Sequence, residues 1–115
     1  MGRRRFVAVA LAMTIMLAAA AVPASAAFVV RAEGTSFRPA RAEVARGTRV
    51  AWRAVGGTHT VTAFGGGWSK DTRIRAGERT GFTFRQRGTF RYRCRIHSTL
   101  SDGRCNGMCG RVVAG

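Results

Sequence analysis

Hydrophobic and polar side chains alternate with a period of two over much of residues 27–115. In RVAWR at 49–53, Val50 and Trp52 alternate with arginine or alanine. In TFRYRCR at 89–95, two aromatic residues and a cysteine alternate with arginines. This period is typical of strands with one buried face. The strands that the pattern predicts cover 28–30, 49–53, 58–63, 81–85, 89–95 and 111–114.

Glycine-containing turn signals separate these segments, for example RGT at 46–48, VGG at 55–57 and FGGGWS at 64–69. No stretch of 27–115 has the 3.6-residue period of an amphipathic helix. Several short strands at regular spacing, separated by turns, are typical of a sandwich or barrel. The sequence therefore predicts one all-β domain over 27–115, a Greek-key antiparallel β-sandwich or barrel.

The first 26 residues have the organisation of a secretory signal peptide. Arginines occupy positions 3–5, an apolar run covers 6–22, and Ala24 and Ala26 stand at the small-residue positions of a cleavage site. The apolar run is short for a membrane span, although an uncleaved anchor is the alternative. We therefore predict a mature chain that begins after Ala26 and is secreted or extracytoplasmic, by either the general or the twin-arginine route.

The chain is strongly basic, with 20 lysines and arginines against 5 acidic residues. Without the three leader arginines, the mature chain keeps 20 − 3 = 17 basic residues against 5 acidic ones, a formal charge of +12. Such a charge favours anionic partners. Because export argues against nucleic acid, we expect acidic proteins or anionic polymers. The alternative is that most of these arginines form a solvated surface and bind no specific partner.

Few side chains of residues 27–115 can bind a metal through nitrogen or sulfur. They are His59, Cys94, His97, Cys105, Met108 and Cys109. Two imidazoles and one thiolate in a trigonal plane, with a weak axial thioether, form a blue-copper electron-transfer site. Thiolate and thioether favour Cu(I), whereas imidazole suits both oxidation states. The inventory thus predicts one copper ion.

Four stretches of the chain together resemble the cupredoxin family, in particular plastocyanin-like proteins. They are FRPARAEVARGTRVAW (37–52), HTVTA (59–63), GTFRYRCRIH (88–97) and GMCGRVVA (107–114). The resemblance covers nearly all of the mature chain. It implies a one-electron carrier, not an enzyme, that acts as a monomer with a redox protein partner.

The resemblance also implies the roles of individual residues. His59, Cys94, His97 and Met108 would be the copper ligands, and His97 would carry electrons to the partner. Thr60, next to the first ligand, would tie the two ligand loops together by hydrogen bonds.

One departure from the family pattern is the ten-residue gap between His97 and Met108. At the shorter spacing that is usual in the family, this chain offers Leu100, which cannot bind a metal, or Asp102, which is hard and charged. We prefer Met108, because the strand after it anchors the match. The intervening SDGRCN then becomes a surface excursion.

The chain has three cysteines, an odd number for an exported protein. If Cys94 is a ligand, the other two remain as a pair. We predict a Cys105–Cys109 disulfide that holds the long loop. A zinc site made of Cys94, His97, Cys105 and Cys109 is an alternative. A dinuclear copper site would need a histidine after Cys109, and the chain has none there. Copper handling and a copper-free, disulfide-bonded binding module also remain open.

Overall fold

The computed structural model describes residues 2–3, 8–12, 14 and 27–115, and the predicted signal peptide lies mostly outside this part. Among the described residues, no helix is long and apolar enough to cross a membrane. Their regular structure consists of strands. These are β1 (Phe28–Glu33), β2 (Ser36–Arg38), β3 (Arg41–Val44), β4 (Arg49–Val55), β5 (Thr58–Phe64), β6 (Asp71–Arg75), β7 (Arg79–Thr83), β8 (Gly88–Ser101) and β9 (Arg104–Ala114).

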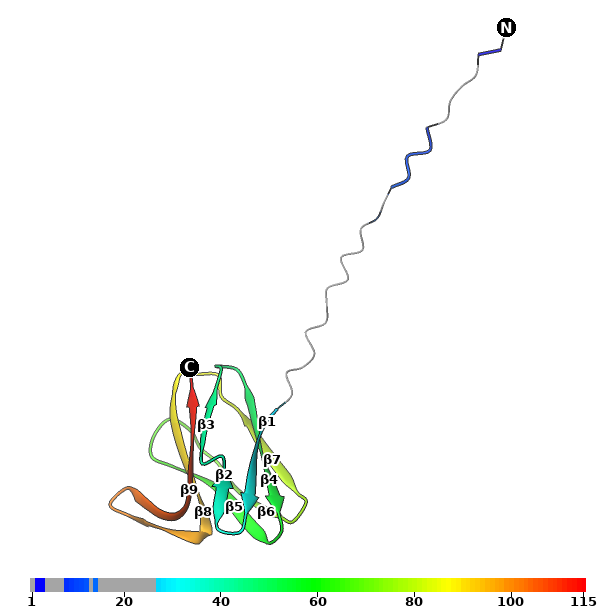
Figure 1. Ribbon diagram of the computed structural model, residues 1–115. Coiled ribbons are helices and arrows are strands. Elements are labelled where there is room, and N and C mark those ends of the chain that lie inside the picture. Colours follow the sequence, from blue (N-terminus) through cyan, green and yellow to red (C-terminus); the bar gives the residue numbers. More distant parts are fainter. Residues whose placement is uncertain (1, 4–7, 13, 15–26) are drawn as a thin grey trace.

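The strands form two sheets that pack as a sandwich (Figure 1). One has the order β2-β1-β4-β7 and the other β3-β9-β8-β5-β6. This confirms the predicted all-β sandwich. The sheets are mixed, however, because β1 pairs with β4 and β3 pairs with β9 in parallel. The chain changes sheet between β2 and β3, and this crossover brings strands of the same direction together.

The alternation of side chains in the sequence corresponds closely to burial in the structure. On β4, Val50 and Trp52 are fully buried, and on β8 the side chains of Phe90, Tyr92 and Cys94 point into the core. The β8 arginines between them lie on the other face, where they are exposed or half-buried. Because a strand turns every second side chain inward, the aromatic core and Cys94 share one face.

On β5 the burial differs from the simple alternation that the sequence predicts. His59, Thr60 and Val61 are all buried, although Thr60 points away from the face of its two neighbours. The hydrogen bonds described below explain this burial, since a buried hydroxyl needs partners.

The end of β8 and the start of β9 form a longer hairpin than the sequence pattern predicted (Figure 1). The segment expected as a surface excursion is paired strand, with Ser101 opposite Arg104. Asp102 and Gly103 make the turn, both with positive φ (49° and 71°). An Asp-Gly pair is a strong signal for a two-residue hairpin turn.

Two polar atoms lie in the centre of the core. Trp52 Nε1 and the Tyr92 hydroxyl have no hydrogen-bond partner among the described residues. Their rings pack edge to face, with centroids 5.2 Å apart. Burial raises the pKa of Tyr92 to about 12. The indole N–H of Trp52 offsets part of this rise, although it does not reach hydrogen-bonding geometry with the hydroxyl.

We predict that the protein loses stability in alkali through Tyr92, the only tyrosine of the chain. Its ordinary pKa is about 10, and in the folded protein it is about 12. The contribution of Tyr92 is therefore intact below pH 10 and falls by about 2 to 3 kcal/mol as the pH rises through the folded pKa. Unfolding free energies against pH, with tyrosinate absorbance, measure this. Tyr92→Phe should lack the decline, and an equal decline in both proteins would contradict the prediction.

Candidate metal centre

Three side chains meet at the end of the sandwich where β5 begins. They are His59 of β5 with Cys94 and His97 of β8, and their ligand atoms lie within 4.8 Å of one another. Cys94 Sγ lies 4.0 Å from His59 Nδ1 and 3.5 Å from His97 Nδ1. With metal–sulfur bonds of about 2.3 Å and metal–nitrogen bonds of about 2.0 Å, trigonal ligands would lie about 3.7 Å apart. The three residues thus form a candidate copper site.

The orientation of His59 follows from a contact with the preceding turn. Its Nε2 lies 3.0 Å from the carbonyl oxygen of Gly56, and its side chain is 1% exposed. A carbonyl oxygen can only accept, so Nε2 carries the proton and Nδ1, on the Cys94 side, has a free lone pair. Such a contact fixes both the tautomer and the ring direction of a metal ligand. The Gly56 carbonyl was not singled out from the sequence.

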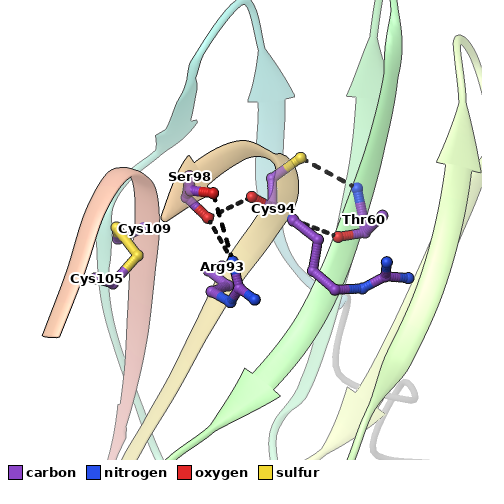
Figure 2. The surroundings of a disulfide bond; sticks show 7 residues. Thr60, Arg93, Cys94, Ser98, Cys105 and Cys109 are labelled. Atoms are coloured by element: carbon purple, nitrogen blue, oxygen red, sulfur yellow. Dashed lines mark hydrogen bonds between the residues drawn. A yellow bond between two sulfur atoms is a disulfide. The ribbon is translucent and has the colours of Figure 1, made fainter. Parts of the chain in front are cut away.

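The Cys94 sulfur is fully buried and receives a backbone hydrogen bond. The N–H of Thr60 donates to Cys94 Sγ at 3.4 Å, and the N–H of Arg95 donates to Thr60 Oγ1 at 2.8 Å (Figure 2). These two bonds join β5 to the end of β8 around the sulfur. They agree with the role that the resemblance implied for Thr60. The N–H of Thr60 thus gives the buried sulfur a hydrogen-bond partner.

The Thr60 hydroxyl begins a chain of hydrogen bonds that ends at the surface. Thr60 Oγ1 lies 3.0 Å from Thr62 Oγ1, and Thr62 donates to Asp71 at 2.8 Å. The Arg95 guanidinium reaches the same carboxylate at 3.0 Å. The Thr62 hydroxyl and the Arg95 side chain hold the pKa of Asp71 below its ordinary value. This series of hydrogen bonds extends from Thr60 to the surface, and the sequence pattern did not predict it.

A break in strand pairing lets Cys94 and His97 face the same site. Residues three apart in a regular strand point to opposite faces. Here the β8–β9 register is irregular between Arg93 and Ser98. The bulge turns the His97 ring toward Cys94 and leaves it only half-buried, whereas His59 is buried.

Met108 lies on β9 opposite this bulge. The pairing passes from Arg93–Cys109 to Ser98–Gly107, so Met108 is the one β9 residue opposite the four β8 residues in between. Its side chain is 1% exposed and belongs to the core cluster. A Cβ at Gly107 would collide with the carbonyl oxygen of His97, and Gly107 has a φ of 105°. Glycine thus allows β9 to approach the bulge closely.

The two alternative axial residues lie in other environments. Asp102 is exposed at the hairpin turn, and Leu100 is 42% exposed. Among the three candidates, only Met108 is buried.

Cys105 and Cys109 are joined by a disulfide, with an S–S distance of 1.98 Å. Their Cα atoms are 6.1 Å apart, whereas four residues of straight strand would span about 13 Å. The bond therefore holds β9 bent beside Met108. Figure 2 shows the Cys94 sulfur pointing toward Thr60 and away from the disulfide. The zinc alternative needs both bonded sulfurs as thiolates, and neither belongs to the three-residue cluster.

Solved structures with the same fold include cupredoxins. Amicyanin from Paracoccus versutus matches with a TM-score of 0.64 and 22% identity, over 79% of this chain and 83% of amicyanin. A purple cupredoxin from Nitrosopumilus maritimus matches with a TM-score of 0.62 and 17% identity, over 76% and 99%. A copper-containing nitrite reductase from Thermus scotoductus matches at 0.64 and 24%, over 78% of this chain but 22% of that enzyme. No protein-family model and no curated protein matches this sequence. The chain has the cupredoxin fold.

We predict that Thr60→Val lowers the free energy of unfolding by about 1 to 3 kcal/mol. The substitution keeps the shape but leaves the Arg95 N–H without its acceptor and ends the hydrogen-bond chain to Asp71. Urea denaturation of the metal-free protein measures the loss. Thr89→Val, at an exposed position of β8, is the matched control and should change stability by less than about 0.5 kcal/mol. Equal losses in the two variants would contradict the prediction.

Proposed function

We propose that the protein is an exported type 1 copper protein that carries single electrons by cycling between Cu(II) and Cu(I). The observation that carries this proposal is the close cluster of Cys94 Sγ with the Nδ1 atoms of His59 and His97. Two imidazoles, one thiolate and a nearby thioether are the donor set of a blue-copper site. When bound, copper would supply a one-electron couple in this position.

The assignment of electron transfer rather than catalysis rests on the number of ligands and their burial. With Met108 as the fourth ligand, the metal would have no open position for a substrate. Cys94, His59 and Met108 are buried, whereas His97 is half-buried at the surface. Ile96, beside it, is 49% exposed. We infer that a redox partner docks here and that electrons pass through the His97 ring.

Copper handling in the cell envelope is the second candidate, and a loose axial loop would favour it. The disulfide-bonded hairpin and the Thr60 hydrogen bonds support a rigid site instead. Rigid ligands keep their positions when the metal changes oxidation state, which suits rapid electron transfer.

The charge of the chain and its N-terminal residues complete the proposal. The excess of arginine favours an acidic redox protein as partner, with no role for nucleic acid. Residues 1–26 would direct the chain to an extracytoplasmic compartment and be removed after Ala26. We propose that residues 27–115 act there as a monomer.

We predict that Cu(II) added to residues 27–115 produces an intense blue absorption band that Cys94→Ser abolishes. The band requires charge transfer from the Cys94 thiolate, and a serine oxygen cannot replace it. The matched control is the double variant Cys105→Ser/Cys109→Ser, which removes two sulfurs that are not ligands and should keep the band. Absorbance and electron paramagnetic resonance measure the result. A colourless protein that binds zinc tightly would contradict the proposal.

We further predict that Met108→Leu keeps the blue band and raises the reduction potential by an amount on the order of 60 mV, a tenfold change in the Cu(II)/Cu(I) equilibrium. Leucine removes a weak donor and makes the surroundings more apolar, which disfavours the more highly charged ion. Voltammetry measures the shift, and a reversible wave separates a carrier from a handling protein. Asp102→Asn should leave the potential unchanged. A shift in that variant instead would identify Asp102 as the axial ligand.

A further inference from the structure

Three arginines stand side by side across the outer face of the five-stranded sheet. Arg41 of β3 is paired with Arg111 of β9, and Arg111 is paired with Arg91 of β8. Phe64 of β5 continues the row beyond Arg91. All three arginines are exposed. Neighbouring strands lie about 4.8 Å apart, so the row brings three cationic side chains together across three strands.

This row forms part of a groove of about 530 Å³. The groove is lined by residues of the sheet face and of the disulfide-bonded β8–β9 hairpin. The hairpin contributes Arg104, Cys105 and Asn106. Four arginines therefore surround one concavity that also has an aromatic side chain at one end. A groove of this size is in the range of small-molecule sites.

The charges in the groove are poorly compensated by the protein itself. No acidic residue lines it among the described residues. Arg41 is paired with Glu43 at 2.7 Å, whereas Arg91, Arg104 and Arg111 make no salt bridge in the described part of the chain. Like charges directly opposite each other in a sheet are destabilising. A bound anion would remove this repulsion.

We propose that this groove is a binding site for a small multivalent oxyanion, a molecule with two or more adjacent phosphate or carboxylate groups. Guanidinium groups bind both kinds of oxyanion through paired hydrogen bonds. The row of Arg41, Arg111 and Arg91 faces one side of the ligand, and Arg104 reaches it from the hairpin. The site lies on the outer face of β8 and β9, whereas Cys94 and Met108 belong to the inner face, so binding does not require a metal.

Isothermal titration of residues 27–115 with tripolyphosphate and, separately, with citrate tests the proposal. We expect one molecule to bind per chain. The dissociation constant should be at least about tenfold higher in Arg91→Gln/Arg111→Gln, because each lost charge-assisted hydrogen bond weakens the binding free energy. The anion should also raise the thermal midpoint of the wild-type protein more than that of the variant. Tighter binding of tripolyphosphate would assign a phosphate ligand, and tighter binding of citrate a carboxylate.

The control must separate a built site from general attraction to a basic protein. Arg53 and Arg79 are exposed and directly opposite each other on the other sheet, outside this groove. Arg53→Gln/Arg79→Gln therefore makes the same change in net charge and should raise the dissociation constant by less than about threefold. Equal weakening in the two double variants, or no saturable binding to the wild type, would overturn the proposal. Circular dichroism confirms that the variants are folded.

Discussion

The candidate site depends on one pair of hydrogen bonds that joins β5 to the end of β8. The Thr60 N–H donates to the Cys94 sulfur, and the Arg95 N–H donates to the Thr60 hydroxyl. Without this contact, the start of β5, which carries the first histidine, and the Cys-x-x-His segment of β8 would be held together only by the β5–β8 pairing farther along the strands. With it, the ligand from β5 is fixed relative to the two from β8. The Thr60 hydroxyl is fully buried. Without this hydrogen bond, a polar group would be left unsatisfied in the core, which is costly.

The surroundings of this contact restrict each candidate ligand separately. The Gly56 carbonyl orients the His59 ring, the register break turns His97 toward the sulfur, and the disulfide bends β9 where Met108 lies. These constraints come from a turn, a bulge and a covalent bond, so they do not compete for the same atoms. A site held in this way would need little rearrangement during the proposed electron transfer, and this is the physical link between the fold and the proposed function.

The sequence predicted the sandwich and brought forward His59, Cys94 and His97, because a strict period of two and a short inventory of soft ligands are local signals. It missed β2, β3 and β6, in which a single side chain is buried, since so short a pattern has no period. The parallel strand pairs and the register break depend on how distant strands meet, and no local pattern encodes that. The Asp102–Gly103 turn, by contrast, has a local signal in the sequence. An Asp-Gly pair between two strands would have predicted the hairpin.

The alternation along β8 serves both faces of the sheet at once. Its inward positions carry Phe90, Tyr92 and Cys94, and its outward arginines supply one member of the row on the sheet face, Arg91, and the Arg95 contact with Asp71. A shift of β8 by one residue would place charged side chains in the core and the thiol on the surface. The large cost of burying those charges therefore fixes the register. The arginines help to position the candidate ligand Cys94 even though none of them lies in the core.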